Sequence, residues 1–217
     1  MTRPAPSPDS GRKASKDVRR QQLIDATIRV LGQKGYAALT VADVAKAAGL
    51  STGIVIFHFN SKDELLAATM QFLAEEYRTH WEEEMKQVGG APEDQLQALL
   101  LSDFDVEVFT AEKLGAWIAF WGETQGRPTY DQICSGLDAE RQQATLELCR
   151  ALIADGGYAL DAATAMQTLE ALCDGLWLGV AAHGAGHAGR VSPGEAHRII
   201  QTALKALFPR HYGAPEN

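Results

Sequence analysis

Apolar residues in this chain recur every three or four positions almost continuously from residue 16 to the C-terminus. This spacing places them along one face of a helix, whereas no window shows the alternation that a half-buried strand requires. A first helix is predicted over residues 16–34, with Gly35 ending it in the left-handed conformation. The pattern therefore predicts an all-α fold.

Two short helices joined by a tight turn are predicted next. A capping box at residues 40–43 begins the first helix, and Gly49 is expected to end it because the turn needs a positive φ. Ser51 or Thr52 is expected to cap the second helix, which runs to about Phe59. Small residues are expected where the two helices cross: Ala42, Ala45, Ala47 and Ala48. Such a pair is typical of a helix-turn-helix motif.

A long helix is predicted after this motif. Residues 61–64 form another capping box, and helical spacing continues until Gly89 and Gly90 interrupt it. Beyond Pro92, the predicted helices are apolar enough to form one bundle. They span residues 93–107, 111–124, 129–155, 161–183 and 193–207. The predicted fold is a three-helix head joined by a long connector helix to a C-terminal helical bundle.

These elements predict two domains between two tails. A helix-turn-helix DNA-binding domain is expected over residues 16–60, and a helical ligand-binding and dimerisation domain over residues 61–210. Residues 1–15, which are rich in Pro, Ser and Arg, are expected to form a disordered basic tail, and residues 211–217 a second disordered tail.

Charge is distributed unevenly along the chain. Residues 1–60 contain nine Lys and Arg against four Asp, a net charge of +5, whereas the rest of the chain has a net charge of −13. A basic head is suited to contact with phosphate, and an acidic body is not. Chance unevenness of solvated faces is the alternative that charge alone leaves open.

The residue spacings do not indicate metal, redox or nucleotide chemistry. Cys134, Cys149 and Cys173 are odd in number and widely spaced, so neither a disulfide framework nor a zinc site is indicated. Residues 184–189 spell G-x-G-x-x-G, but they follow a predicted helix rather than a strand. We therefore expect no enzyme activity, no cofactor and no metal. Because the chain has neither a run of 18 apolar residues nor a signal-peptide pattern, we expect a cytoplasmic protein.

The segment 40–65, TVADVAKAAGLSTGIVIFHFNSKDEL, resembles the signature of the TetR family of transcriptional repressors. The matching positions are Thr40, Ala45, Ala48, Gly49, Leu50, Ser51, Gly53, His58, Phe59, Lys62 and Leu65. The resemblance implies a three-helix DNA-binding head, a helical ligand domain, and a homodimer made by helices near 138–155 and 161–183. It also implies a repressor that binds palindromic operator DNA and leaves it when a small molecule binds.

The resemblance assigns the helix from Ser51 to Phe59 to the major groove of DNA. Thr40 and Lys62, at the N-termini of flanking helices, are expected to contact phosphates. The residues expected at the DNA are Thr40, Ser51, Thr52, Gly53, Phe57, His58 and Lys62.

Three other positions qualify this assignment. Phe59 and Leu65 are expected to be core residues rather than DNA contacts. Where the family usually has a Tyr that contacts phosphate, this chain has Ile56. A hydroxyl contact is therefore missing, and either weaker phosphate binding or an apolar contact with a thymine methyl is implied.

Aromatic residues and carboxylates occur together in the C-terminal half. Trp117 and Trp121 are four residues apart on one predicted helix face, and carboxylates lie close in sequence to Phe104 and Trp177. Aromatic faces with desolvated carboxylates are suited to an organic cation. The residues expected at the ligand are Phe104, Asp105, Trp117, Phe120, Trp121, Asp174 and Trp177.

Residues 103–105, 116–121 and 174–177 resemble the C-terminal domain of the choline-responsive repressors of glycine-betaine synthesis, the BetI-like branch. This resemblance implies a choline-like cation as inducer, and the acidic body leaves a polyamine open as well. Two further alternatives stay open. The tryptophans could only fill a core, and the chain could be a DNA-binding regulator with no small-molecule inducer.

Overall fold

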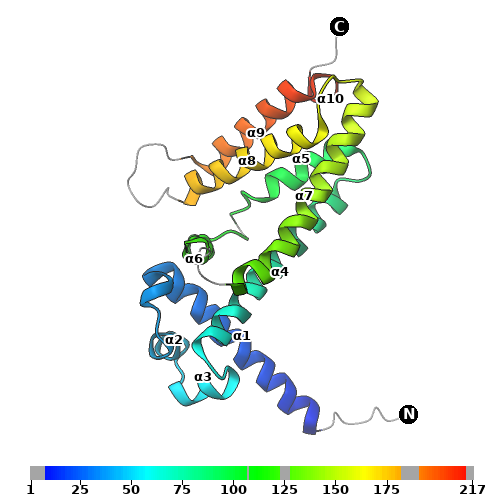
Figure 1. Ribbon diagram of the computed structural model, residues 1–217. Helices are drawn as coiled ribbons and strands as arrows, with labels where there is room; N and C mark the ends of the chain where they lie inside the picture. The colour runs from blue at the N-terminus through cyan, green and yellow to red at the C-terminus, as the bar shows by residue number, and fades with distance from the viewer. Residues whose placement is uncertain (1–7, 107, 123–127, 182–190, 214–217) are drawn as a thin grey trace, which may run out of the picture. The chain divides into compact units, whose positions relative to one another are not determined.

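The computed structural model describes residues 8–106, 108–122, 128–181 and 191–213 (Figure 1). Regular structure in these residues is entirely α-helical, so the predicted all-α fold is confirmed. The helices are α1 (Pro8–Ala38), α2 (Val41–Ala48), α3 (Thr52–His58), α4 (Lys62–Gln87), α5 (Pro92–Ser102), α6 (Ala111–Trp121), α7 (Pro128–Gly156), α8 (Ala162–Ala181), α9 (Pro193–Leu207) and α10 (Pro209–Tyr212). The G-x-G-x-x-G stretch at 184–189 lies outside the described residues.

The chain divides into two compact units. The first comprises Met1–Leu73 and Glu112–Asp131, and the second comprises Ala74–Ala111 and Gln132–Asn217. One boundary falls inside α4, which therefore contributes residues to both units. Almost all of α6 belongs to the first unit, although its sequence lies in the stretch predicted for the C-terminal bundle.

The helix α1 forms a large part of the first unit. It begins at Pro8 instead of residue 16, and proline is favoured at a first helical position because its φ is already near the helical value. Gly35 has the expected positive φ of 75°, but its ψ of 175° is extended, so the chain kinks there and a last helical turn follows. The predicted apolar stripe is buried: Leu23, Ile24, Thr27, Ile28, Val30 and Leu31.

Local hydrogen bonds set the ends of α2. The Thr40 hydroxyl accepts from the backbone N–H of Asp43, and the Asp43 carboxylate accepts from that of Thr40, each at 3.2 Å, so the predicted capping box is present. Lys34 also donates to Asp43, and this bond is the main cause that lowers the pKa of the Asp43 carboxyl. Gly49 ends the helix in the left-handed conformation, with φ 66° and ψ 31°.

The turn at Gly49 bends the chain by 104° between α2 and α3. This angle lies in the range of about 90–120° found in helix-turn-helix motifs. Ala45 and Ala48 are buried as predicted, whereas Ala42 and Ala47 are exposed because they lie on the outer face of α2.

Two facing glycines explain why α6 packs in the first unit. A Cβ atom on Gly115 would lie 2.8 Å from the Cα of Gly32, and one on Gly32 would lie 2.9 Å from the carbonyl oxygen of Glu112. Only glycine allows two helix backbones to approach this closely. The Phe120 ring also meets the Tyr36 ring edge-on, with 5.9 Å between centroids.

The core of the second unit is formed by side chains from α4, α5, α7, α8 and α9. Its fully buried members include Leu96, Leu99, Leu100, Leu169, Ile200, Leu204 and Phe208. The helix α5 ends at Ser102, earlier than the predicted 107. The short helix α10 was not predicted and extends into the segment expected as a C-terminal tail. It is held by Tyr212, whose hydroxyl donates to the carbonyl of Glu93 at 2.6 Å.

In the part of the chain that the structure describes, no single helix is long and apolar enough to cross a membrane. The bent pair of α2 and α3 would be long and apolar enough only if its two helices were counted as one segment.

Candidate DNA interface and ligand site

The N-terminal end of α3 presents small and hydroxyl-bearing residues to solvent. Of the two predicted cap residues, Ser51 is the backbone N-cap, but its hydroxyl makes no capping hydrogen bond. Thr52 and Gly53 are exposed. A Cβ on Gly53 would meet only the Ser51 hydroxyl, at 3.8 Å, so packing within the first unit does not require glycine there.

The remaining predicted DNA-binding residues also lie in the first unit. Thr40 is exposed at the start of α2, where its hydroxyl forms the capping box. Lys62 begins α4, and its ammonium donates to the carbonyl of Tyr36 at 3.5 Å and lies 5.8 Å from the centre of that ring. Phe57 is 72% exposed. His58, which is half-buried, follows it at the end of α3.

The surroundings of His58 disfavour its charged form. Burial is the main cause that lowers its pKa, and the positive charges of Lys16, Arg20 and Arg19 on α1 lower it further. Its Nδ1 atom is buried and has no hydrogen-bond partner among the described residues. The Phe57 ring meets the imidazole edge-on, with 5.2 Å between ring centroids.

The second predicted capping box is only half formed. The Ser61 hydroxyl accepts from the backbone N–H of Glu64 at 3.0 Å. The Glu64 carboxylate, however, accepts from the backbone and side chain of Asn60, at 3.2 and 2.8 Å, because the Asn60 amide offers a second donor. Phe59 and Leu65 are fully buried, which confirms them as core residues.

A network of charged and polar side chains is buried in the second unit; we call it the Asp103 cluster, and its members are Tyr77, Asp103, Arg141, Thr145 and Glu170. The Arg141 guanidinium donates to Asp103 at 2.8 Å and also to Glu170. Tyr77 donates to the other oxygen of Asp103 at 2.9 Å, and Thr145 donates to Glu170 at 2.7 Å. Arg141 and Asp103 are only 5% and 7% exposed.

Negative charge exceeds positive charge in this cluster. Asp103 and Glu170 share a single guanidinium, that of Arg141. Burial raises the pKa of Asp103 to about 6, although Arg141 acts in the opposite direction. Asp138 and Asp174 are exposed, but partial desolvation still raises the pKa values of their carboxyls, and neighbouring carboxylates, Asp174 and Glu170 respectively, raise them further. Such a site favours an additional cation.

Arg141 also retains an unused donor. Its Nε atom is buried and has no hydrogen-bond acceptor among the described residues. Sequence reasoning did not assign Tyr77, Arg141 or Glu170 to the site, because they come from α4, α7 and α8 and meet only in the folded unit. One signal in the sequence could have indicated this site: Arg141 lies on α7 at a position where helical spacing predicts a buried side chain.

The structure places four predicted ligand residues in the second unit. Phe104 is buried in its core, and Asp105 lies 3.6 Å from the His80 imidazole. Trp177 packs partly buried against the core. Asp174 is exposed, yet its charge raises the pKa of Asp103.

The other three predicted ligand residues are on α6, in the first unit. Phe120 is buried against Tyr36. Trp117 is half-buried, and Trp121 is 40% exposed. The predicted set is therefore divided between two units of the fold.

A helix-turn-helix followed by a helical domain defines a class of DNA-binding transcriptional regulators, and comparison with known proteins specifies the family. Residues 23–69 match the model of bacterial regulatory proteins of the tetR family, and residues 92–209 match the C-terminal model of BetI-type transcriptional repressors. The HTH-type transcriptional regulator BetI of Paraburkholderia xenovorans (strain LB400) is 35% identical over 166 residues, which cover 75% of this chain and 82% of the relative. The chain belongs to the TetR family and carries a BetI-type C-terminal domain. It is a transcriptional regulator and not an enzyme.

Solved structures share this fold. A transcriptional regulator from Pseudomonas aeruginosa PAO1 has a TM-score of 0.75 and 25% identity, over 90% of this chain and 93% of that one. A transcriptional regulator from Saccharomonospora viridis in complex with choline has a TM-score of 0.76 and 18% identity, over 87% of this chain and 96% of that one. At 18% identity, the second likeness shows the fold alone.

Proposed function

We propose that this chain is a ligand-responsive repressor, which binds palindromic operator DNA as a homodimer and is released by a small organic cation. The observation that supports a cationic inducer is that two carboxylates of the Asp103 cluster, buried Asp103 and half-buried Glu170, share one guanidinium, that of Arg141. A carboxylate removed from water is costly unless a positive charge lies close to it. A bound monocation would balance the charge that Arg141 leaves uncompensated.

The aromatic part of the cluster favours an organic cation over a metal ion. The Arg141 guanidinium carbon lies 6.0 Å from the centre of the Tyr77 ring, so this ring already faces a cation. The described residues contain no group of three or more His, Cys, Asp and Glu that could hold a metal. The choline bound to the Saccharomonospora viridis regulator supports the same ligand class. Choline and polyamines are the candidates.

The helix α4 offers a route from ligand to head. Tyr77 belongs to the second unit and bonds Asp103, whereas the residues of α4 up to Leu73 belong to the first unit. A cation that rearranges the Asp103 cluster acts on Tyr77 and hence on α4. The coupling needed between two such sites is typically about 1 to 3 kcal/mol. Repression would end when the two heads no longer fit major grooves about 34 to 36 Å apart.

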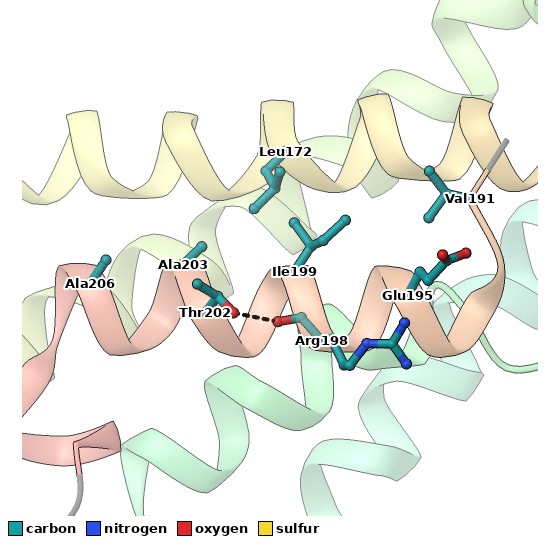
Figure 2. A pocket seen from close by; sticks show the side chains of 8 residues that line it. All are labelled: Leu172, Val191, Glu195, Arg198, Ile199, Thr202, Ala203 and Ala206. Carbon is teal, nitrogen blue, oxygen red and sulfur yellow. Dashed lines mark hydrogen bonds between the residues drawn. The ribbon is translucent and has the colours of Figure 1, made fainter. Parts of the chain in front are cut away.

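We further propose that the homodimer forms through α8 and α9. Figure 2 shows a groove along these helices, where Leu172 and Ile199 point toward each other. Ile199, which lines this groove, is 40% exposed, and Leu178 of α8, outside the groove, is 43% exposed. A second copy would bury the same face on both subunits. The family resemblance implied a dimer through helices near 138–155 and 161–183, so α8 is common to both proposals and α9 takes the place of α7.

Release of DNA by defined cations tests the proposed function. A fluorescent duplex selected from random DNA by the full-length protein would be titrated with choline or spermidine, with glycine betaine as a zwitterionic control and NaCl matching ionic strength. We expect choline or spermidine to lower the anisotropy and raise the melting temperature of the free protein. Asp103→Asn should reduce both effects. If no cation has either effect, the chain is a DNA-binding regulator without this inducer.

A further inference from the structure

The outward face of α3 is apolar. Val55 is buried, with 1% of its surface exposed, and it anchors the helix. On the remaining faces, Ile54, Ile56 and Phe57 are 38%, 48% and 72% exposed. Helical spacing places Gly53 and Phe57 on the side opposite Val55, and Ile56 on a flank between the two sides. Three large apolar side chains are thus exposed on one seven-residue helix.

Positive charge lies beside this apolar face. Lys16, Arg19 and Arg20 of α1 act on His58 at the C-terminal end of α3, where they help to lower its pKa. Lys16 and Arg19 are exposed. A surface that combines apolar side chains with exposed cations fits DNA better than an apolar protein partner, because the cations can contact phosphates while the helix meets the base edges.

The residue types on α3 restrict which bases it can read. Guanine is most often read by Arg or Lys and adenine by Asn or Gln, and α3 contains none of these four. His58 is half-buried, and burial lowers its pKa, which disfavours the charged imidazolium. The C5-methyl of thymine is the one apolar group on the major-groove edge of the bases.

We propose that α3 recognises its operator chiefly through thymine methyl groups, with Ile56 and Phe57 as the side chains that contact them. The inference rests on the proposed function, because it assumes that α3 enters the major groove. The edge-on contact with His58 limits the positions that the Phe57 ring can adopt. Gly53 leaves space beside Phe57, so the helix backbone can approach the bases closely.

Replacing thymine by deoxyuridine tests this proposal, because uracil lacks only the methyl group and keeps the same hydrogen-bonding edge. A duplex selected by the full-length protein would be resynthesised with deoxyuridine at each thymine in turn, and its dissociation constant measured by fluorescence anisotropy at one fixed salt concentration. We expect a loss of about fourfold for each contacted thymine, the effect of removing one buried methyl-sized group.

Two variants complete the test. Phe57→Ala should bind the thymine duplex more weakly and abolish the difference between thymine and deoxyuridine at the contacted position. Arg19→Ala should weaken binding to both duplexes equally and keep their ratio. Equal affinity of the wild-type protein for both duplexes would overturn thymine reading while leaving DNA binding intact. Failure to select any duplex would overturn the proposed function itself, and this inference with it.

Discussion

Gly53→Ala is expected to change stability and DNA binding in opposite directions. Gly53 lies within α3 and is exposed, and its φ is not in the positive region that favours glycine. The added methyl would meet only the Ser51 hydroxyl, at 3.8 Å, which is an ordinary contact distance. The folded first unit therefore has room for alanine, and the only close neighbour that the methyl could disturb is DNA.

The two effects can be given magnitudes. Alanine inside a helix is more favourable than glycine by about 0.5–1 kcal/mol. For a chain of this size, that gain raises the melting temperature by about 1–4 °C. If Gly53 marks the closest approach to the bases, the methyl costs about one base contact, or about 1–3 kcal/mol. The dissociation constant should then rise about fivefold to 150-fold.

Calorimetry and fluorescence anisotropy measure the two effects on the same preparation. Gly136→Ala is the matched control, because Gly136 is also exposed within a helix, α7, and has nothing within 4 Å of its added Cβ. The control should gain similar stability without losing DNA affinity. The reasoning is refuted if Gly53→Ala binds the selected duplex as tightly as the wild type does.

Four other variants probe separate parts of the account. Asp103 holds its proton in the folded state up to a pKa of about 6 but releases it near 3.8 when unfolded. This tighter proton binding stabilises the folded state below pH 3.8, and the contribution is lost as the pH rises to 6. In urea unfolding, the free energy of unfolding of the wild type should therefore fall by about 2–3 kcal/mol over this range, and Asp103→Asn should remove that fall. An unchanged pH profile would contradict the burial of this carboxyl. Gly115→Ala should destabilise the protein by about 1–3 kcal/mol, because the methyl meets the α1 backbone, whereas Gly90→Ala, in open space, should not. Lys62→Ala should weaken binding to all duplexes alike, and a change in sequence preference would argue against a phosphate contact. Trp121 lies on α6 in the first unit, outside the Asp103 cluster, and is 40% exposed, so Trp121→Ala should keep both the choline response and operator binding; loss of the response would contradict the assignment of the cation to the Asp103 cluster.

The helix-turn-helix was predictable because its signals are local. The capping box at Thr40 and the left-handed Gly49 depend on neighbouring residues, and both are present in the structure. The same holds for the buried stripe of α1 and for the core positions Phe59 and Leu65. Gly35 was predicted to end the first helix. Its extended ψ angle instead makes a kink, and a last helical turn follows it.

The parts that depend on distant residues were not predictable from local pattern. The assignment of α6 to the first unit follows from Gly32 meeting Gly115, and neither glycine reveals its partner in the sequence. The Asp103 cluster joins Tyr77, Arg141 and Glu170 across three helices. Sequence spacing grouped carboxylates with nearby tryptophans, whereas the fold pairs Asp103 with an arginine 38 residues away.

Selection of duplexes from random DNA by the purified full-length chain tests the central claim most directly. The account predicts enrichment of a palindrome whose half-sites lie about one helical turn apart. It also predicts that Gly53→Ala and Lys62→Ala bind the selected sequence more weakly. A chain that enriches no sequence would contradict the claim that this helix-turn-helix reads operator DNA, and a single unpaired site would contradict its action as a symmetric dimer.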